Sequence, residues 1–80
     1  MKTVKVKVLY FASLRELLGK AEDSVQTEST LGVASIWRSL NPDTQLPDAC
    51  LIAINQEYAS IDSEVKAGDE LAFFPPVTGG

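Results

Sequence analysis

The first regular pattern along the chain is an alternation of apolar and charged residues. In residues 4–10, VKVKVLY, the valines and the tyrosine fall on one face and the lysines fall on the other. A period of two is typical of a strand with one buried and one exposed face. The pattern predicts a strand over 4–10, and residues 23–28, DSVQTE, predict a second strand that returns beside it.

A short helix is predicted between these two strands, in SLRELLG at 13–19. Ser13 and Glu16 have the spacing of a capping box, in which each side chain bonds a free backbone N–H at the start of a helix. Gly19 can adopt the left-handed conformation that ends many helices. We therefore expect Ser13 to be the N-cap and Gly19 the stop.

The main helix is predicted in STLGVASIWRSLNP, residues 29–42. Its apolar residues recur at helical spacing, at Val33, Ile36, Trp37 and Leu40. We expect Ser29 or Thr30 to be the N-cap, Gly32 to lie in the first turn and Pro42 to enforce the end. Trp37 is predicted to lie in the core, with its indole N–H bonded to an acceptor.

The rest of the chain predicts short strands joined by turns. A polar loop at 41–48 is followed by a buried strand ACLIAI, which an Asn55-Gln56 turn connects to a strand EYAS. A turn KAGDE and a last strand ELAFF follow. This order predicts an α+β roll, a mixed sheet with one main helix packed on one face. We expect one domain over 1–74 and an extended tail over 75–80.

Composition narrows the function classes. The 80 residues allow one core only. A net charge of −4, from 7 Lys and Arg against 11 Asp and Glu, argues against nucleic-acid binding and favours basic protein partners. No apolar run is long enough to span a bilayer, which predicts a soluble, cytoplasmic protein without membrane contact.

Few residues are available for catalysis or metal binding. Histidine is absent, which removes the commonest general base and metal ligand, so we expect no metal site. Cys50 is the single cysteine, so no internal disulfide can form, which favours a reducing compartment. Its apolar context, ACLIAI, predicts a small buried hydrophobe and not a reactive thiol.

The end of the sequence, AFFPPVTGG, is therefore the best candidate for chemistry. Pro75 and Pro76 favour an extended course away from the sheet, and six residues can reach about 20 Å. Gly79 and Gly80 lack Cβ atoms and can pass a narrow channel. The reactive group would be the Gly80 α-carboxylate, which is ionised at neutral pH and must be activated, as by adenylation with ATP, before it accepts a nucleophile.

Three segments carry a resemblance to a known family. They are YFASLRELLG, LIAINQEY and GDELAFFPPVTGG, and together with their spacing they span essentially the whole chain. The sequence resembles the small sulfur-carrier subunits of molybdopterin synthase, within the ubiquitin-like β-grasp family. SIWRSL and the NPDTQLPDA loop depart from the usual pattern of that family, in a region that bears on helix packing.

The resemblance implies a function centred on Gly80. An activating enzyme would adenylate its carboxylate with ATP, sulfur transfer would give a thiocarboxylate, and the tail would enter the large subunit of the synthase. Sulfur would then pass to a cyclic pyranopterin monophosphate to build the molybdopterin dithiolene, in a heterotetramer with two carriers. The carrier would hold no permanent cofactor.

The resemblance also assigns residues to partner binding. Phe74 and the tail residues Pro75, Pro76, Val77, Thr78 and Gly79 would dock on and enter the partner, while Phe11 and Arg15 would support the interface. By strand parity Phe73 shares a face with Leu71, whereas Phe74 faces the other way and is free for a partner. Phe11 could equally be a core residue, and Arg15 could simply pair with a surface acid.

Other functions start from the same ending. The chain could be a sulfur carrier of another pathway, such as thiazole or cysteine synthesis. It could be a ubiquitin-like modifier joined to lysines through Gly80, since conjugation uses the same adenylate. It could also be an inert interaction domain with an idle tail.

Overall fold

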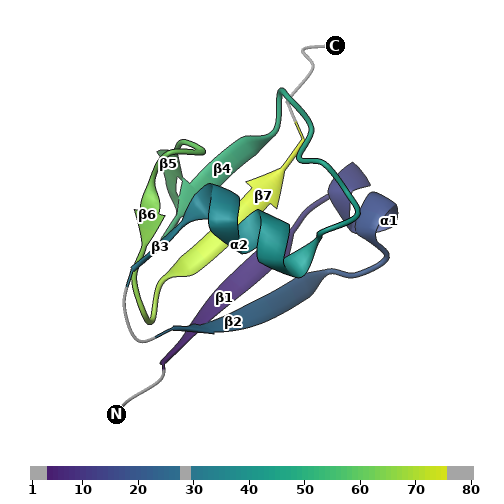
Figure 1. The fold of residues 1–80 in the computed structure, drawn as a ribbon. Helices are drawn as coiled ribbons and strands as arrows, with labels where there is room; N and C mark the ends of the chain where they lie inside the picture. Colours follow the sequence, from purple (N-terminus) through teal and green to yellow (C-terminus); the bar gives the residue numbers. More distant parts are fainter. Residues whose placement is uncertain (1–3, 28–29, 76–80) are drawn as a thin grey trace.

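The fold is described from a computed structural model, which describes residues 4–27 and 30–75 (Figure 1). Its helices are α1 (Ser13–Leu18) and α2 (Val33–Leu40). Its strands are β1 (Val4–Tyr10), β2 (Glu22–Thr27), β3 (Leu31–Gly32), β4 (Leu51–Ile54), β5 (Glu57–Ala59), β6 (Glu64–Val65) and β7 (Glu70–Phe74). Every strand predicted from the sequence is present, and β3 and β6 are additions.

Five strands of the described residues form one mixed sheet in the order β2-β1-β7-β4-β5. The two central strands, β1 and β7, run parallel, with Lys7 beside Glu70 and Tyr10 beside Phe73. The β1–β2, β4–β5 and β4–β7 pairs are antiparallel. The last strand of the sequence therefore lies in the middle of the sheet and is held from both sides.

The core lies between the sheet and α2, which crosses one face of the sheet (Figure 1). Val6, Val8 and Tyr10 are at most 1% exposed, as the alternation in β1 predicts. Three aromatic rings pack together between the sheet and α2. The Phe73 ring stacks on Tyr10 at 6.1 Å and meets the Trp37 ring edge-on at 4.9 Å. The α+β roll with its main helix on one face is confirmed.

Trp37 connects α2 to the loop that follows it. Its side chain is 3% exposed, and the indole Nε1–H donates to the carbonyl oxygen of Thr44 at 2.8 Å. Both predictions for Trp37 are confirmed. The loop between α2 and β4 is thus fixed on the helix by a hydrogen bond that is largely shielded from water.

The start of α2 differs from the prediction. Neither Ser29 nor Thr30 is its N-cap, because residues 31–32 form β3 and pair with β6. The N-cap is Gly32, without a side-chain bond, and the Val33 N–H donates to the Ser63 carbonyl oxygen at 3.0 Å. A backbone group that is distant in sequence satisfies the helix end, so Gly32 precedes the first turn.

The prediction for the start of α1 was also wrong. Its N-cap is Ala12, with φ 52°, and no side-chain cap bond forms, so Ser13 is the first helical residue and not the cap. The Phe11 N–H donates to the Phe73 carbonyl oxygen at 3.1 Å, which extends the pairing with β7 by one residue and forces a sharp turn at Ala12. Gly19 does end the helix, with φ 72°, as predicted.

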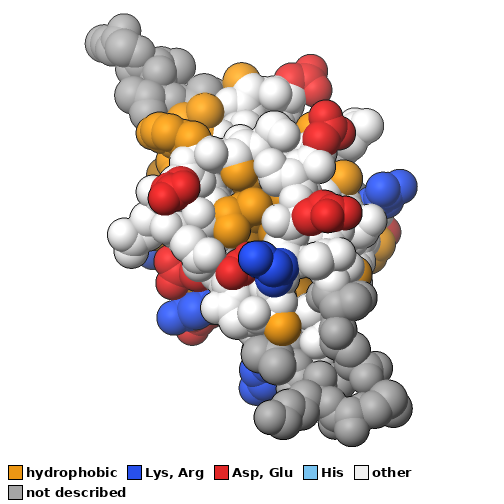
Figure 2. Space-filling view, turned by 90° about the vertical axis from the view of Figure 1, so that its left-hand side faces the viewer, with side chains coloured by type: hydrophobic (Ala, Val, Ile, Leu, Met, Phe, Trp, Pro, Cys, Tyr) orange, Lys and Arg blue, Asp and Glu red, His pale blue; other side chains and the backbone are white. Residues whose placement is uncertain are grey.

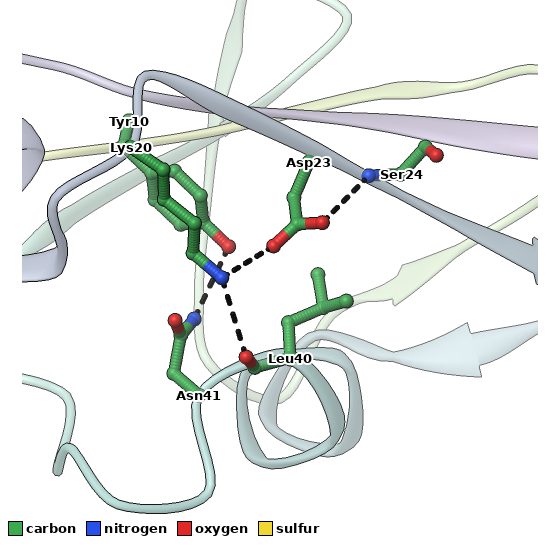
Figure 3. Close-up of polar contacts among 6 residues, drawn as sticks. All are labelled: Tyr10, Lys20, Asp23, Ser24, Leu40 and Asn41. Carbon is green, nitrogen blue, oxygen red and sulfur yellow. Dashed lines mark hydrogen bonds and ion pairs between the residues drawn. The ribbon is translucent and has the colours of Figure 1, made fainter.

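A polar cluster joins the C-terminal end of α2 to β1 and β2 (Figure 3). Lys20 Nζ donates to Asp23 at 2.6 Å and to the Leu40 carbonyl oxygen at 3.3 Å, and a cation is favourable at the end of a helix. Asn41 Nδ2 donates to the Tyr10 hydroxyl at 3.1 Å. Burial raises the pKa of Tyr10, so this hydroxyl stays neutral.

A second cluster joins two turns at the other end of the sheet. Asn55 and Gln56 both have positive φ, as expected for the β4–β5 turn. The Asn55 amide donates to Asp69 at 2.9 Å and accepts the Glu70 N–H at 3.0 Å. The other Asp69 oxygen accepts the Lys66 N–H at 2.8 Å. These bonds set the position where β7 begins.

No helix in the described ranges is long and apolar enough to cross a membrane.

Candidate functional site

The candidate site is the end of β7, where the chain reaches Phe74 and Pro75. Phe73 and Phe74 lie opposite Ile52 and Leu51 of β4. On the other side, the Phe73 carbonyl oxygen accepts the Phe11 N–H. The final strand is therefore held by neighbours up to the residue before the prolines, and the base of the tail has a defined position.

Phe73 and Phe74 occupy opposite faces of the sheet, as strand parity predicts. Phe73 is fully buried, whereas Phe74 is half-buried on the face opposite α2. The Phe74 ring meets Phe11 at 5.9 Å, edge-on, and Tyr58 at 6.2 Å, tilted. We call these three residues the outer aromatic cluster.

The outer aromatic cluster is open to solvent. Phe11 is 45% exposed and Tyr58 is 77% exposed. Leu9, Leu51, Ala53 and Ala72 share this face by register, because Ala72 pairs with both Leu9 and Ala53, and Leu51 pairs with Phe74. No helix of the described residues covers this face, since α2 packs on the other one. An apolar face of this kind is typical of a protein interface.

Cys50 also lies at the base of the tail. Its thiol is half-buried and donates to the Phe74 carbonyl oxygen, with Sγ and O 3.4 Å apart. Burial raises the pKa of Cys50, and the Phe74 contact opposes this more weakly. The thiol is therefore protonated at neutral pH and acts as a small apolar residue, as its sequence context predicts, although its burial is only partial.

Phe11 and Arg15 are separated by the sharp turn at Ala12. Phe11 is exposed and contacts Phe74, so it is not a core residue. The Arg15 side chain is exposed on α1, and no described carboxylate lies within ion-pair distance of its guanidinium. The structure thus brings Phe11 to the site and does not place Arg15 in contact with the cluster.

The rest of the predicted tail, Pro76, Val77, Thr78, Gly79 and Gly80, lies outside the described residues. Its docking role and the reactivity of Gly80 stay predictions. Within the described ranges, no group of three or more His, Cys, Asp or Glu residues is arranged to hold a metal ion.

Sequence reasoning missed Tyr58 as a member of this site. It lies in a three-residue edge strand, and its contact with Phe74 spans β4. The alternation of β5 marks Tyr58 as facing away from Ala59, but it does not say which face is the buried one. The missing information is the strand order of the sheet.

The chain matches the model of the ThiS family over residues 8–80. It is 40% identical to the molybdopterin synthase sulfur carrier subunit of Haemophilus influenzae, over 94% of this chain and 99% of that protein. It is 37% identical to the protein of the same name from Escherichia coli, again over 94% and 99%.

Solved structures show the same fold. Small archaeal modifier protein 1 of Haloferax volcanii superposes with a TM-score of 0.74 at 28% identity, over 92% of this chain and 99% of that one. The complex of subunits 1 and 2 of the molybdopterin-converting factor from Helicobacter pylori contains a chain with a TM-score of 0.63 at 20% identity, over 96% and 100%, which shows the fold alone. With a family match that spans residues 8–80 and the ubiquitin-like β-grasp fold of these neighbours, the chain belongs to the ThiS family.

Proposed function

We propose that this chain is the sulfur-carrier subunit of a molybdopterin synthase, with Gly80 as its reactive end. The observation that carries the proposal is the junction of β7 and the tail. The last strand is held by β1 up to Phe73 and by β4 up to Phe74, and an open apolar face adjoins that point. The domain presents the tail, and the outer aromatic cluster gives a partner a surface to bind. The names of the full-length relatives support the same function.

The chemistry of the tail has three stages, which are adenylation of Gly80, formation of the thiocarboxylate and donation of its sulfur. The Gly80 carboxylate attacks the α-phosphate of ATP on an activating enzyme, which releases pyrophosphate and leaves a transient acyl-adenylate. A sulfur nucleophile then displaces AMP and gives the thiocarboxylate. Attack of this sulfur on a cyclic pyranopterin monophosphate forms one carbon–sulfur bond and a thioester to Gly80. Water hydrolyses the thioester, so the sulfur stays on the pterin and Gly80 returns to a carboxylate, and a second thiocarboxylate supplies the other sulfur of the dithiolene. ATP is a substrate of the activating enzyme, and the carrier holds no cofactor.

The proposal divides the work between subunits. The large subunit of the synthase binds the outer aromatic cluster, receives residues 75–80 and supplies the acid–base and phosphate-binding side chains, in a heterotetramer with two carriers. The carrier alone is a co-substrate and not an enzyme. We also propose a cytoplasmic location without membrane or nucleic-acid contact, which suits a protein with one free thiol and a net charge of −4.

Intact-mass spectrometry tests the proposal. Protein co-expressed with its activating enzyme in a sulfur-replete host is expected to show replacement of one oxygen by sulfur, located by fragmentation to Gly80. A variant that ends at Gly79 is the matched control and is expected to keep its unmodified mass. If full-length protein never gains the sulfur mass under these conditions, the proposal fails.

The second candidate is a protein modifier, and the likeness to small archaeal modifier protein 1 favours it. The two functions diverge after adenylation, because conjugation transfers Gly80 to a lysine amine while carriage transfers sulfur. In the native host, a search for lysine peptides branched with residues 67–80, the remnant that trypsin leaves by cleaving after Lys66, separates them. Sulfur carriage predicts a thiocarboxylate without such conjugates, and rescue of molybdopterin synthesis separates it from carriage for thiazole or cysteine synthesis.

A further inference from the structure

A second surface with interface character lies around the loop between α2 and β4, and it meets the outer aromatic cluster at Tyr58. Two hollows adjoin there. One of about 670 Å³ lies between α2 and the loop, and one of about 330 Å³ lies between the loop and the β4–β5 edge. Both are lined by Leu46, Pro47, Asp48 and Ile61. The two hollows adjoin at these residues, and we call them together the loop groove.

The floor of the loop groove is apolar and well anchored. Trp37 and Ala34 line its α2 side, and the bond from Trp37 to Thr44 holds the loop in place. Ile61, in the turn after β5, is 39% exposed at the point where the hollows meet. A large aliphatic side chain held in water on a structured turn offers an anchor point for a bound chain.

Negative charge gathers on this side of the molecule. Residues 43–70 contain seven Asp and Glu against one Lys, whereas residues 1–42 contain four against six Lys and Arg. The excess negative charge therefore comes entirely from the segment that builds β4, β5, β6 and the loop. Figure 2 faces the side that carries β5 and β6 and shows hydrophobic side chains near the middle, with acidic side chains and also basic ones around them.

The carboxylates beside the loop groove lack ionic partners. Asp43 and Asp48 line it, and Asp62 adjoins Ile61. None of the three lies within ion-pair distance of a described Lys or Arg, whereas Glu22 and Asp23 on the other side both have one. The groove has a single cationic lining residue, Arg38. An apolar floor with unneutralised acids at its rim complements a segment with apolar anchors and basic flanks.

We infer that the loop groove is a docking surface for an extended, basic segment of a partner protein, with Lys or Arg on both sides of aliphatic anchors. Two adjoining hollows suit successive side chains of an extended chain, and the neighbouring β5 is an edge strand of the sheet, which leaves room alongside. The smaller hollow is lined by Cys50 and Tyr58, so the groove reaches the edge of the outer aromatic cluster at Tyr58, whereas Phe11 and Phe74 do not line it. The inference does not rest on sulfur carriage.

The test uses the full-length chain and a synthetic peptide probe in which two leucines are flanked on each side by two lysines. Isotope-labelled protein is titrated with this peptide, and amide chemical shifts and Trp37 fluorescence are followed, since Trp37 is the only tryptophan. Saturable shifts are expected at 46–48 and 59–62. A peptide with serines in place of the leucines is expected to bind about tenfold more weakly, because it lacks the anchors.

Two substitutions locate the binding. Ile61→Ser is expected to weaken binding of the peptide by about tenfold. The double variant Asp48→Lys with Asp62→Lys is expected to weaken this binding at least as much at low salt. Leu17→Ser is the matched control, because Leu17 is 58% exposed on α1 and lines neither hollow, and it is expected to bind like the unaltered protein. Phe11→Ala is also expected to bind normally.

Four results would overturn the inference. The first is that the serine peptide binds as tightly as the leucine peptide, and the second is that the chemical shifts change only on the face of the sheet that carries Phe11 and Phe74. The third is that the Ile61→Ser variant binds the peptide like Leu17→Ser. The fourth is that the protein forms concentration-dependent dimers that Ile61→Ser abolishes, which would assign the groove to a second copy of the chain. If Ile61→Ser lowers the melting temperature, the inference is judged from the double variant Asp48→Lys with Asp62→Lys alone. None of these results bears on the mass gain at Gly80, so the two proposals fail separately.

Discussion

Two neighbouring phenylalanines have opposite environments at the end of β7. Phe73 is fully buried between Tyr10 and Trp37, while the half-buried Phe74 ring meets the exposed rings of Phe11 and Tyr58. The same side chain therefore contributes to folding at one position and is available for binding at the next. Substitution of each residue separates the two contributions.

Phe73→Ala is expected to lower the free energy of unfolding by about 3–5 kcal/mol, because it leaves a cavity among the core rings. A domain of this size is stable by about 4–12 kcal/mol, so the variant should lose between roughly a quarter and all of its stability. Phe74→Ala should keep the melting temperature within a few degrees and weaken partner binding by about 1 kcal/mol or more, roughly fivefold. Calorimetric unfolding and binding to the large subunit measure the two effects. Unchanged binding by Phe74→Ala would remove it from the interface.

Asp69 is expected to make stability depend on pH in acid. The Lys66 N–H, followed by the Asn55 amide, holds the pKa of Asp69 below its ordinary value of 3.8. The folded state therefore prefers the ionised form, so the stabilisation is complete above the unfolded pKa and is lost as pH falls through the folded pKa. Denaturant unfolding of Asp69→Asn should show a smaller loss of stability than the unaltered protein below about pH 4. Parallel curves for the two proteins would contradict this.

Among the helices and strands, α2 depends most on groups distant in sequence. Its first N–H is bonded by Ser63, its last residues contact Lys20, and its tryptophan holds the following loop. Gly32, its N-cap, carries no side-chain bond and has φ −72°, which any L-residue can adopt. A Cβ there would lie 3.8 Å from Ser35 Oγ, an ordinary contact. A side chain at position 32 could therefore increase the stability of the fold.

Gly32→Ser is expected to raise the free energy of unfolding by about 0.4–1 kcal/mol, because it lowers the entropy of the unfolded chain and adds a capping hydroxyl. Serine is preferable to aspartate here, since Glu64 lies opposite in the register. The melting temperature should rise by about 2–6 °C. Gly19→Ala is the contrasting control and should lose about 1–2 kcal/mol, because φ at Gly19 is 72°. A destabilised Gly32→Ser would show that β3 does not tolerate a side chain.

At the scale of the whole molecule, we propose that the folded domain presents the tail and that Gly80 carries the chemistry. Among the described residues, those of the buried core all lie between Val6 and Phe73. The strand before the tail is the central one of the sheet, so the tail begins from a rigid position. Presentation and chemistry can therefore be lost independently.

Deletion of Gly80 is expected to leave the melting temperature within about 1 °C while it abolishes sulfur transfer to the pterin, because the reacting carboxylate is displaced by one residue. Thermal unfolding and a reconstituted synthase assay measure the two quantities. Binding of the large subunit through the outer aromatic cluster should be largely retained. Retained pterin sulfuration in the deletion variant would contradict the proposed mechanism.

Much of the fold could be predicted because local patterns were strong. The alternation in VKVKVLY, the helical spacing around Trp37 and the positive-φ turn at Asn55 each depend on neighbouring residues, and each appears in the structure. The two helix starts could not be predicted in this way. Next to Ala12 and Gly32, the Phe11 and Val33 N–H groups donate to the carbonyl oxygens of Phe73 and Ser63. These acceptors lie tens of residues away in the sequence, and they help to decide where each helix begins.

The sequence alone determined the class of the fold, the opposite faces of Phe73 and Phe74, and the tail as the candidate reactive end, because each follows from residue type and local periodicity. Only the tertiary structure decided that Tyr58 joins Phe11 and Phe74, that Cys50 lies beneath the tail, and that the loop groove and its acidic rim share one side. Such groupings depend on strand order and on how a loop packs against a helix. These are properties of the assembled core, and no single stretch of the chain contains them.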